Sequence, residues 1–252
     1  MSPVAFSNSD TPVLAAQILR LLDLTSLGEE DRPGDIEALC ALARTGVSPA
    51  AVCVYPEHVT TARRALAGTD VRIATVVNFP YGGDDAGQVR RETRRALAAG
   101  ADEIDLVLPW RAFRAGETAL AQQVVDAGRS ACGSGHALKL ILETGELGSA
   151  EAIRAASELG VAAGVDFLKT STGKVAVNAT PAAAAVMLDV IAAHGGHCGF
   201  KAAGGIRRPE DALAYLTLAR ERLGDDWICP AHFRIGASRL RDELMPLAAP
   251  GA

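Results

Sequence analysis

The sequence predicts a single (β/α)8 TIM barrel, a closed ring of eight parallel strands in which each strand is followed by a helix. Short segments rich in β-branched and apolar residues recur roughly every 25 to 35 residues, and alanine-rich stretches with helical spacing separate them. Such alternation indicates parallel βαβ units. The chain has 252 residues, which matches the length of about 250 that eight units need. A doubly wound open sheet is the alternative, but no Gly-x-Gly-x-x-Gly turn follows the first expected strand.

Strands and helices can be assigned from this pattern. The expected strands span residues 21–25, 50–55, 72–79, 103–109, 138–145, 167–173, 199–205 and 233–238. The clearest expected helices span residues 35–45, 87–99, 150–160, 181–194 and 209–223. Ser149 and Thr180 are of the types that cap helix N-termini, and Gly160 is placed as a helix stop. We expect residues 1–252 to form one catalytic domain, with residues 1–19 as an N-terminal extension or helix.

The composition excludes several classes of protein. Hydrophobic residues make up 49% of the chain and charged residues 22%, which excludes a disordered chain. No apolar run approaches the ~18 residues of a membrane span, and the N-terminus lacks the pattern of a signal peptide. The net charge is −5, so a nucleic acid is not expected as a partner, and the short apolar runs argue against a membrane. Five widely spaced cysteines predict reduced thiols in a cytoplasmic protein, and the scattered histidines predict no metal site.

Charged residues inside the expected strands indicate what the barrel encloses. Side chains of a barrel strand alternate between the interior and the helix layer. Asp105 lies between Ile104 and Leu106, so its side chain is expected to point inward. The same alternation turns further charged strand residues inward, namely Asp23, Lys139, Glu143, Lys169 and Lys201.

The few lysines of the chain are concentrated in this interior. Four of the 25 basic residues are lysines, and all lie in or just after expected strands: Lys139, Lys169, Lys174 and Lys201. Lysine acts as a nucleophile once it has lost its proton, whereas arginine does not. The pattern therefore favours amine chemistry, although ordinary buried ion pairs in an arginine-rich protein explain it equally well.

Lys169 and Lys201 are expected on neighbouring strands about 4.8 Å apart, where they can share one site. Two like charges disfavour each other's protonation, so one amine can become neutral near pH 7. Asp105 is expected at a similar depth, because alternate strands contribute to one layer of a barrel, and a carboxylate there suits proton transfer. These three side chains are the parts of imine catalysis, but the pattern does not tell which lysine forms the imine.

Glycines and cations after the last three expected strands predict an anion site. Loops at this end of such barrels often bind phosphate, and glycine lets backbone N–H groups approach the oxygens closely. The candidate binding residues are Thr172, Gly173, Lys174, Gly204, Gly205, Arg207, Gly236 and Ser238.

Eight blocks of sequence, in order between about residue 20 and residue 240, resemble the 2-deoxyribose-5-phosphate aldolase family. The most specific blocks are DFLKTSTGK at 166–174 and GFKAAGGIR at 199–207, and the others include ADEID at 101–105 and LETGEL at 142–147. The resemblance implies a class I aldolase without metal or cofactor. Such an enzyme reversibly cleaves 2-deoxy-D-ribose 5-phosphate to D-glyceraldehyde 3-phosphate and acetaldehyde.

The resemblance also implies roles for the three interior residues. Lys169 corresponds to the lysine that forms the Schiff base, Lys201 to the neighbour that lowers its pKa, and Asp105 to a proton relay that works with a bound water. The expected partners are a phosphorylated deoxysugar and acetaldehyde. The sequence leaves open whether the chain forms a homodimer.

The chain departs from the family pattern at a few places. Ala202 stands where many relatives have proline, and Arg239 where many have a second serine. Arg239 is expected either to add charge at the phosphate or to point to solvent. The last residues carry no tyrosine, whereas some relatives end in a tyrosine that assists proton abstraction. Two other hypotheses are a different phosphate-binding barrel enzyme, such as a sugar-phosphate isomerase, and a sugar-phosphate sensor without catalysis.

Overall fold

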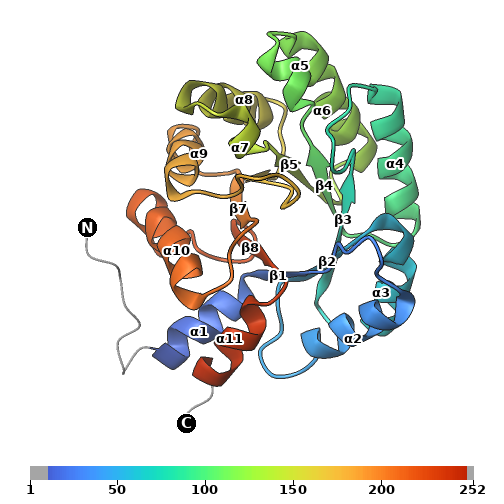
Figure 1. Cartoon of the computed structure of the whole chain (residues 1–252), viewed down its shortest axis with the longest axis vertical. Helices are drawn as coiled ribbons and strands as arrows, with labels where there is room; N and C mark the ends of the chain where they lie inside the picture. The colour runs from blue at the N-terminus through green and yellow to red at the C-terminus, as the bar shows by residue number, and fades with distance from the viewer. Residues whose placement is uncertain (1–10, 249–252) are drawn as a thin grey trace.

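The strands form a closed barrel, as predicted. The computed structural model describes residues 11–248, and in these each strand pairs in parallel with the next along the chain while the last pairs with the first. Figure 1 shows the strands as a central ring with the helices around it. The (β/α)8 fold class is therefore confirmed. No helix in the described part of the chain is long and apolar enough to cross a membrane.

Each expected strand segment overlaps an observed strand, and only β5 begins before its expected segment. The strands are β1 (Leu22–Thr25), β2 (Ala51–Val54), β3 (Arg72–Val77), β4 (Glu103–Val107), β5 (Ala137–Ile141), β6 (Phe167–Lys169), β7 (Gly199–Ala203) and β8 (Phe233–Ala237). Most end earlier than expected, and the predictions over residues 138–145 and 167–173 run furthest past the observed ends. After β6 the chain leaves the ladder because Thr172 binds Glu143 and Gly173 turns with a φ of 85°.

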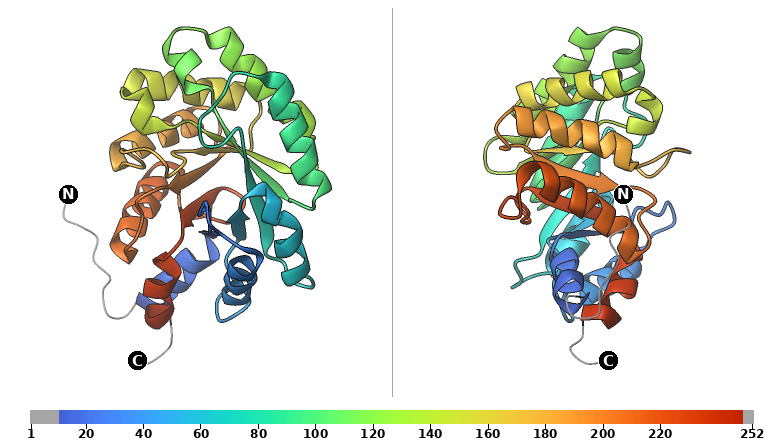
Figure 2. Two further views of the ribbon diagram at one scale, coloured as in Figure 1. Left: turned by 45° about the vertical axis from the view of Figure 1, so that its right-hand side comes forward. Right: turned by 90° about the vertical axis from the view of Figure 1, so that its left-hand side faces the viewer.

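Helices cover the outside of the barrel. They are α1 (Thr11–Arg20), α2 (Pro33–Ala43), α3 (Val59–Ala65), α4 (Ala86–Ala98), α5 (Trp110–Arg114), α6 (Thr118–Cys132), α7 (Thr144–Leu147), α8 (Ala150–Ala162), α9 (Pro181–Ala193), α10 (Pro209–Leu223) and α11 (Leu240–Ala248), with a 3-10 turn η1 (Pro56–His58) before α3. Helices α1 and α11 lie side by side, so the first and last described helices meet (Figure 2). Of the predicted N-terminal extension, residues 1–10 lie outside the described residues.

The predicted helix starts are confirmed, and one predicted stop is wrong. Ser149 accepts a hydrogen bond from Ala152 N, and Thr180 caps α9 in the same way. Gly160, expected to end a helix, lies inside α8, which ends at Ala162. The glycine serves packing instead, because a Cβ at this position would come within 2.7 Å of a Leu168 methyl.

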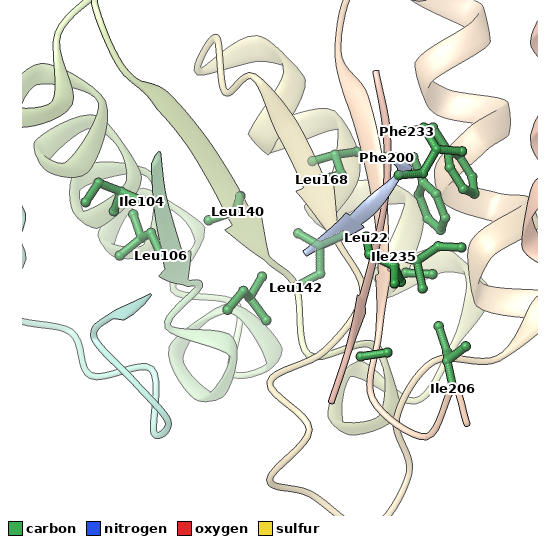
Figure 3. Close-up of a cluster of buried hydrophobic side chains, with 14 of the residues drawn as sticks. Leu22, Ile104, Leu106, Leu140, Leu142, Leu168, Phe200, Ile206, Phe233 and Ile235 are labelled. Carbon is green, nitrogen blue, oxygen red and sulfur yellow. The ribbon is translucent and has the colours of Figure 1, made fainter. Parts of the chain in front are cut away.

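Alternation along the strands separates a charged interior from an apolar outer layer. The residues labelled in Figure 3 belong to this apolar layer, and several flank a charged residue in the sequence. Ile104 and Leu106 flank Asp105, and Phe200 precedes Lys201. Because the apolar side chains pack against the helices, the charged side chains between them must enter the barrel.

At the end of the barrel where the strands finish, the backbones of two connections lie in direct contact. The strand predicted over residues 138–145 is too long, because β5 ends at Ile141 and Glu143 adopts a left-handed φ of 56° before α7 begins. Gly145, in α7, then lies against Val177 of the segment between β6 and α9. A Cβ at Gly145 would lie 1.9 Å from the Val177 carbonyl oxygen, so only glycine fits there without a shift of the backbone.

We therefore expect Gly145→Ala to destabilise the protein by about 1–3 kcal/mol, the usual cost of overpacking. Gly135→Ala is the matched control, because a Cβ there has no neighbour within 4 Å. The midpoint of urea unfolding should fall for Gly145→Ala and stay near wild type for the control. Equal midpoints for the two variants would contradict this account of the contact.

Candidate active site

Asp105, at the centre of β4, binds three lysines inside the barrel. Its Oδ1 accepts a hydrogen bond from Lys139 Nζ at 2.8 Å, and its Oδ2 accepts from both Lys169 and Lys201 at 2.7 Å. All four side chains are at most 3% exposed. Asp105, Lys169 and Lys201 therefore meet, as their expected register required.

The strand order brings these side chains together. They come from four consecutive strands, β4 to β7. Asp105 is paired with Lys139 across β4 and β5, and Lys169 with Lys201 across β6 and β7. Residues paired in a parallel ladder point to the same face of the sheet, so the two residues of each pair face the barrel interior together.

Two further acids and an arginine extend this cluster. Lys201 binds Asp23 of β1, and Lys139 binds Glu103 of β4 at 2.6 Å. Arg234 of β8 completes the ring, with Nη1 2.7 Å from Asp23 and Nη2 2.9 Å from Glu103. Glu103 and Arg234 were not singled out from the sequence. Their signal was available, because Glu103 shares the parity of Asp105 and Arg234 stands between the apolar Phe233 and Ile235.

The environments of the two neighbouring lysines differ. Burial is the largest influence on the pKa of Lys169 and lowers it, Asp105 raises it, and the positive charge of Lys201 lowers it, so that the net shift is downward. Burial also acts to lower the pKa of Lys201, but Asp105 and Asp23 outweigh it and raise that pKa. Lys169 is therefore the amine that loses its proton more readily.

A cavity of about 390 Å³ opens above this cluster. It is lined by Lys169 together with all eight candidate binding residues: Thr172, Gly173, Lys174, Gly204, Gly205, Arg207, Gly236 and Ser238. Lys201 lies directly against Gly236, which lines the cavity, because a Cβ on that glycine would lie 3.1 Å from Lys201 Cε. The cavity is therefore lined by one amine with a lowered pKa, by glycine-rich loops and by two further cations, Lys174 and Arg207.

Loop contacts hold the mouth of this cavity. The buried Glu143 carboxylate accepts hydrogen bonds from the N–H of Thr172, at 3.1 Å, and from its hydroxyl, at 2.5 Å. Lys174 Nζ donates to the Leu27 carbonyl at 2.7 Å, which ties the loop after β6 to the loop after β1. Gly204 and Gly205 have φ values of 90° and 82°, a left-handed conformation that glycine adopts without strain.

Comparison with known proteins identifies the family. The family model described as DeoC/LacD family aldolase matches residues 18–245. The chain belongs to the DeoC/LacD family of aldolases. A crystal structure from Coccidioides immitis, described as "a putative deoxyribose-phosphate aldolase", is 31% identical, with a TM-score of 0.81 and coverage of 92% of this chain and 87% of that one.

Other solved structures agree with this assignment. One described as "QR15, an Aldolase" is 25% identical, with a TM-score of 0.77, and the alignment covers 91% of this chain and 96% of that chain. A Toxoplasma gondii protein described in the same words as the Coccidioides one shares the fold at 24% identity, with a TM-score of 0.85 and coverage of 94% and 96%.

Two other candidate sites, a second cavity and the Cys53 thiol, lack a group that can act as the nucleophile. A larger cavity of about 1050 Å³ lies at the opposite end of the barrel, where the strands begin, and none of the four lysines lines it. Cys53 is fully buried, and burial raises the pKa of its thiol, so it stays protonated beside the lysines. Among residues 11–248, no group of three or more histidine, cysteine or acidic side chains is arranged to hold a metal ion.

Arg239, whose orientation the sequence left open, is exposed beside the main cavity. It lines a hollow of about 290 Å³ together with Arg207 and Ser238. Both of those residues also line the main cavity, so Arg239 adds positive charge at its edge.

Replacing Lys201 tests its influence on Lys169. Lys201→Leu removes a positive charge that lowers the pKa of Lys169. It also leaves the negative charge of Asp105 less compensated, so the pKa of Lys169 should rise. The amine would then be neutral only at higher pH. We expect the pH midpoint for acylation of Lys169, followed by mass spectrometry, to move upward. Lys201→Arg keeps the charge and should move it less. An unchanged midpoint in Lys201→Leu would refute this account of activation.

Proposed function

We propose that the chain is a class I aldolase that reversibly cleaves 2-deoxy-D-ribose 5-phosphate to D-glyceraldehyde 3-phosphate and acetaldehyde. One observation carries the proposal. Of the three lysines bound to Asp105, only Lys169 has a lowered pKa and lines the cavity. A neutral amine that a substrate can reach is the requirement for attack on an aldehyde carbonyl.

In the proposed reaction, the neutral Lys169 amine attacks C1 of the open-chain sugar, and loss of water gives a protonated imine. The imine accepts the electron pair of the C2–C3 bond as it breaks, while the C3 hydroxyl loses its proton and becomes the aldehyde of glyceraldehyde 3-phosphate. The resulting enamine is protonated at C2, and water then hydrolyses the imine, releasing acetaldehyde and the free amine.

Asp105 and Lys201 support these proton transfers. The three lysines outweigh the effect of burial and hold the pKa of Asp105 well below its usual range, so the carboxylate stays ionised. With Oδ2 2.7 Å from both amines, Asp105 can orient Lys169 and pass protons through a water in the cavity. Lys201, whose pKa is raised, stays charged beside Lys169 and favours its neutral form.

The phosphate group would occupy the outer part of the cavity. Backbone N–H groups of Gly173, Gly204 and Gly205 can approach phosphate oxygens closely, while Lys174 and Arg207 supply positive charge. A sugar-phosphate isomerase or a sensor could use the same loops. Neither needs a neutral lysine, which is why the buried cluster favours the aldolase.

The cytoplasm is the compartment that we infer for this reaction. All five cysteines are unpaired thiols, and four of them are buried. Unpaired thiols are typical of proteins kept in a reducing compartment.

Trapping with acetaldehyde tests the nucleophile. Acetaldehyde and borohydride should leave a two-carbon adduct on Lys169 that peptide mapping by mass spectrometry detects, and Lys169→Ala should show none. An adduct on Lys201 would keep the aldolase and reverse the roles of the two lysines. The absence of any adduct on the folded wild-type protein would overturn the proposal.

The phosphate site is tested with two substrates. Lys174→Met should lower kcat/KM for 2-deoxyribose 5-phosphate by about 10- to 100-fold, the loss of one charge-assisted contact. Cleavage of unphosphorylated 2-deoxyribose should change little, because that substrate never used the contact. Equal losses on both substrates would show that Lys174 acts on the loop and not on the phosphate.

A further inference from the structure

A buried ion pair closes the end of the barrel opposite the substrate cavity. Glu103, the first residue of β4, and Arg234, the second of β8, form a salt bridge of 2.9 Å, and we call them the floor pair. Both are at most 5% exposed. Neither lines the substrate cavity, and both border the large cavity at the start of the strands. The floor pair therefore does not touch a substrate bound at Lys169.

Two chains of ion pairs connect the floor pair to Lys169. On one side Glu103 binds Lys139 at 2.6 Å, Lys139 binds Asp105 at 2.8 Å, and Asp105 binds Lys169 at 2.7 Å. On the other side Arg234 binds Asp23, which binds Lys201, and Lys201 binds the same oxygen of Asp105 as Lys169 does. All seven side chains are buried, so the floor pair and the amine interact in a medium of lower dielectric constant than water.

The charges of this cluster do not cancel when every group is ionised. It contains three carboxylates and four basic side chains, so neutrality requires that one basic group be uncharged. Arginine does not lose its proton in proteins. Among the described ion pairs, Lys139 is bound to three carboxylates and Lys201 to two, whereas Lys169 is bound to Asp105 alone. Lys169 is therefore the amine that the cluster can most easily leave neutral.

We propose that Glu103 and Arg234 are positioning residues that set the charge state of the Lys169 amine from the opposite end of the barrel. They act through the ion-pair cluster and never contact the substrate. The negative charge of Glu103 favours the protonated amine, and the positive charge of Arg234 favours the neutral amine. This inference rests on the proposed role of Lys169 as the imine-forming lysine.

Other charged or titratable groups near Lys169 contribute to the same balance. Asp105 of β4, Lys201 of β7 and Cys53 of β2 act on its pKa, and Glu143, after β5, interacts with it too. Asp31, Lys174 and Arg207 line the same cavity. Burial raises the pKa of the Cys53 thiol, and Glu143 is bound to Thr172. Single substitutions in the floor pair leave all of these groups in place. Any change in the titration of Lys169 would therefore come from the floor.

The floor pair can be altered without leaving a buried charge alone. In Glu103→Gln, Lys139 keeps Asp105 and Arg234 keeps Asp23. In Arg234→Met, Glu103 keeps Lys139 and Asp23 keeps Lys201. An unpaired buried charge is the main reason that such variants fail to fold, and here none is created.

The test measures the pH midpoint of imine formation on Lys169. Acetaldehyde and cyanoborohydride are added over a series of pH values, and mass spectrometry gives the ethylated fraction of Lys169. A unit charge about 10 Å from an amine, at an effective dielectric constant near 20, shifts its pKa by roughly one unit. We expect Glu103→Gln to move the midpoint down and Arg234→Met to move it up, each by about one pH unit.

The double variant and a conservative variant separate charge from structure. Glu103→Gln with Arg234→Met removes one charge of each sign, so its midpoint should return towards wild type, whereas structural damage would accumulate. Arg234→Lys keeps the charge and should keep the midpoint. Equal midpoints in all variants, or shifts of the same sign in both single variants, would overturn the inference. The absence of an adduct on wild-type Lys169 would instead refute the proposed function.

Discussion

The arrangement of the barrel interior depends on the burial of one carboxylate. An ionised carboxylate loses several kcal/mol of hydration when it is removed from water, and only close, well-directed partners offset this cost. Asp105 meets the condition with both of its oxygens, which accept hydrogen bonds from three lysines on three other strands. The dependence is mutual, because Lys139 and Lys201 are buried and their charged forms need a carboxylate in turn. The position of Lys169 therefore follows from electrostatics across the strands as much as from the packing of its own strand.

Closure of the sheet brings the remaining charged residues of the cluster into contact. Asp23 on β1 and Arg234 on β8 are adjacent only because β1 pairs with β8, and their contact joins the two ends of the strand sequence. In an open sheet, Lys201 of β7 and Lys139 of β5 would lack the acid that β1 supplies. The apolar outer layer also directs the charged side chains inward. Its residues pack against the helices, so the charged residues between them face the barrel interior (Figure 3).

The sequence sufficed for the fold and for much of the site, because both depend on short repeating patterns. Strand alternation placed Asp105, Lys169 and Lys201 in the interior, and all eight candidate binding residues line one cavity. Strand ends were less predictable, since the end of β6 depends on the contact of Thr172 with Glu143, which lies in the connection after β5. Gly160 was misjudged because its role is to admit a leucine methyl, a contact that no local pattern records. Glu103 and Arg234 were overlooked because their importance lies in a pairing across the whole barrel.

The scarcity of lysine has a practical consequence for chemical modification of this protein. Three of the four lysines are buried, and the exposed one, Lys174, lines the substrate cavity. Reagents that couple proteins to dyes, supports or crosslinkers through primary amines would thus find, apart from the amino terminus, no lysine on the outer surface. Their first lysine target would be the mouth of the site, and immobilisation by this route would block the entrance to the pocket. Attachment through an added surface cysteine, or through the carboxylates of the outer helices, would leave the cavity open.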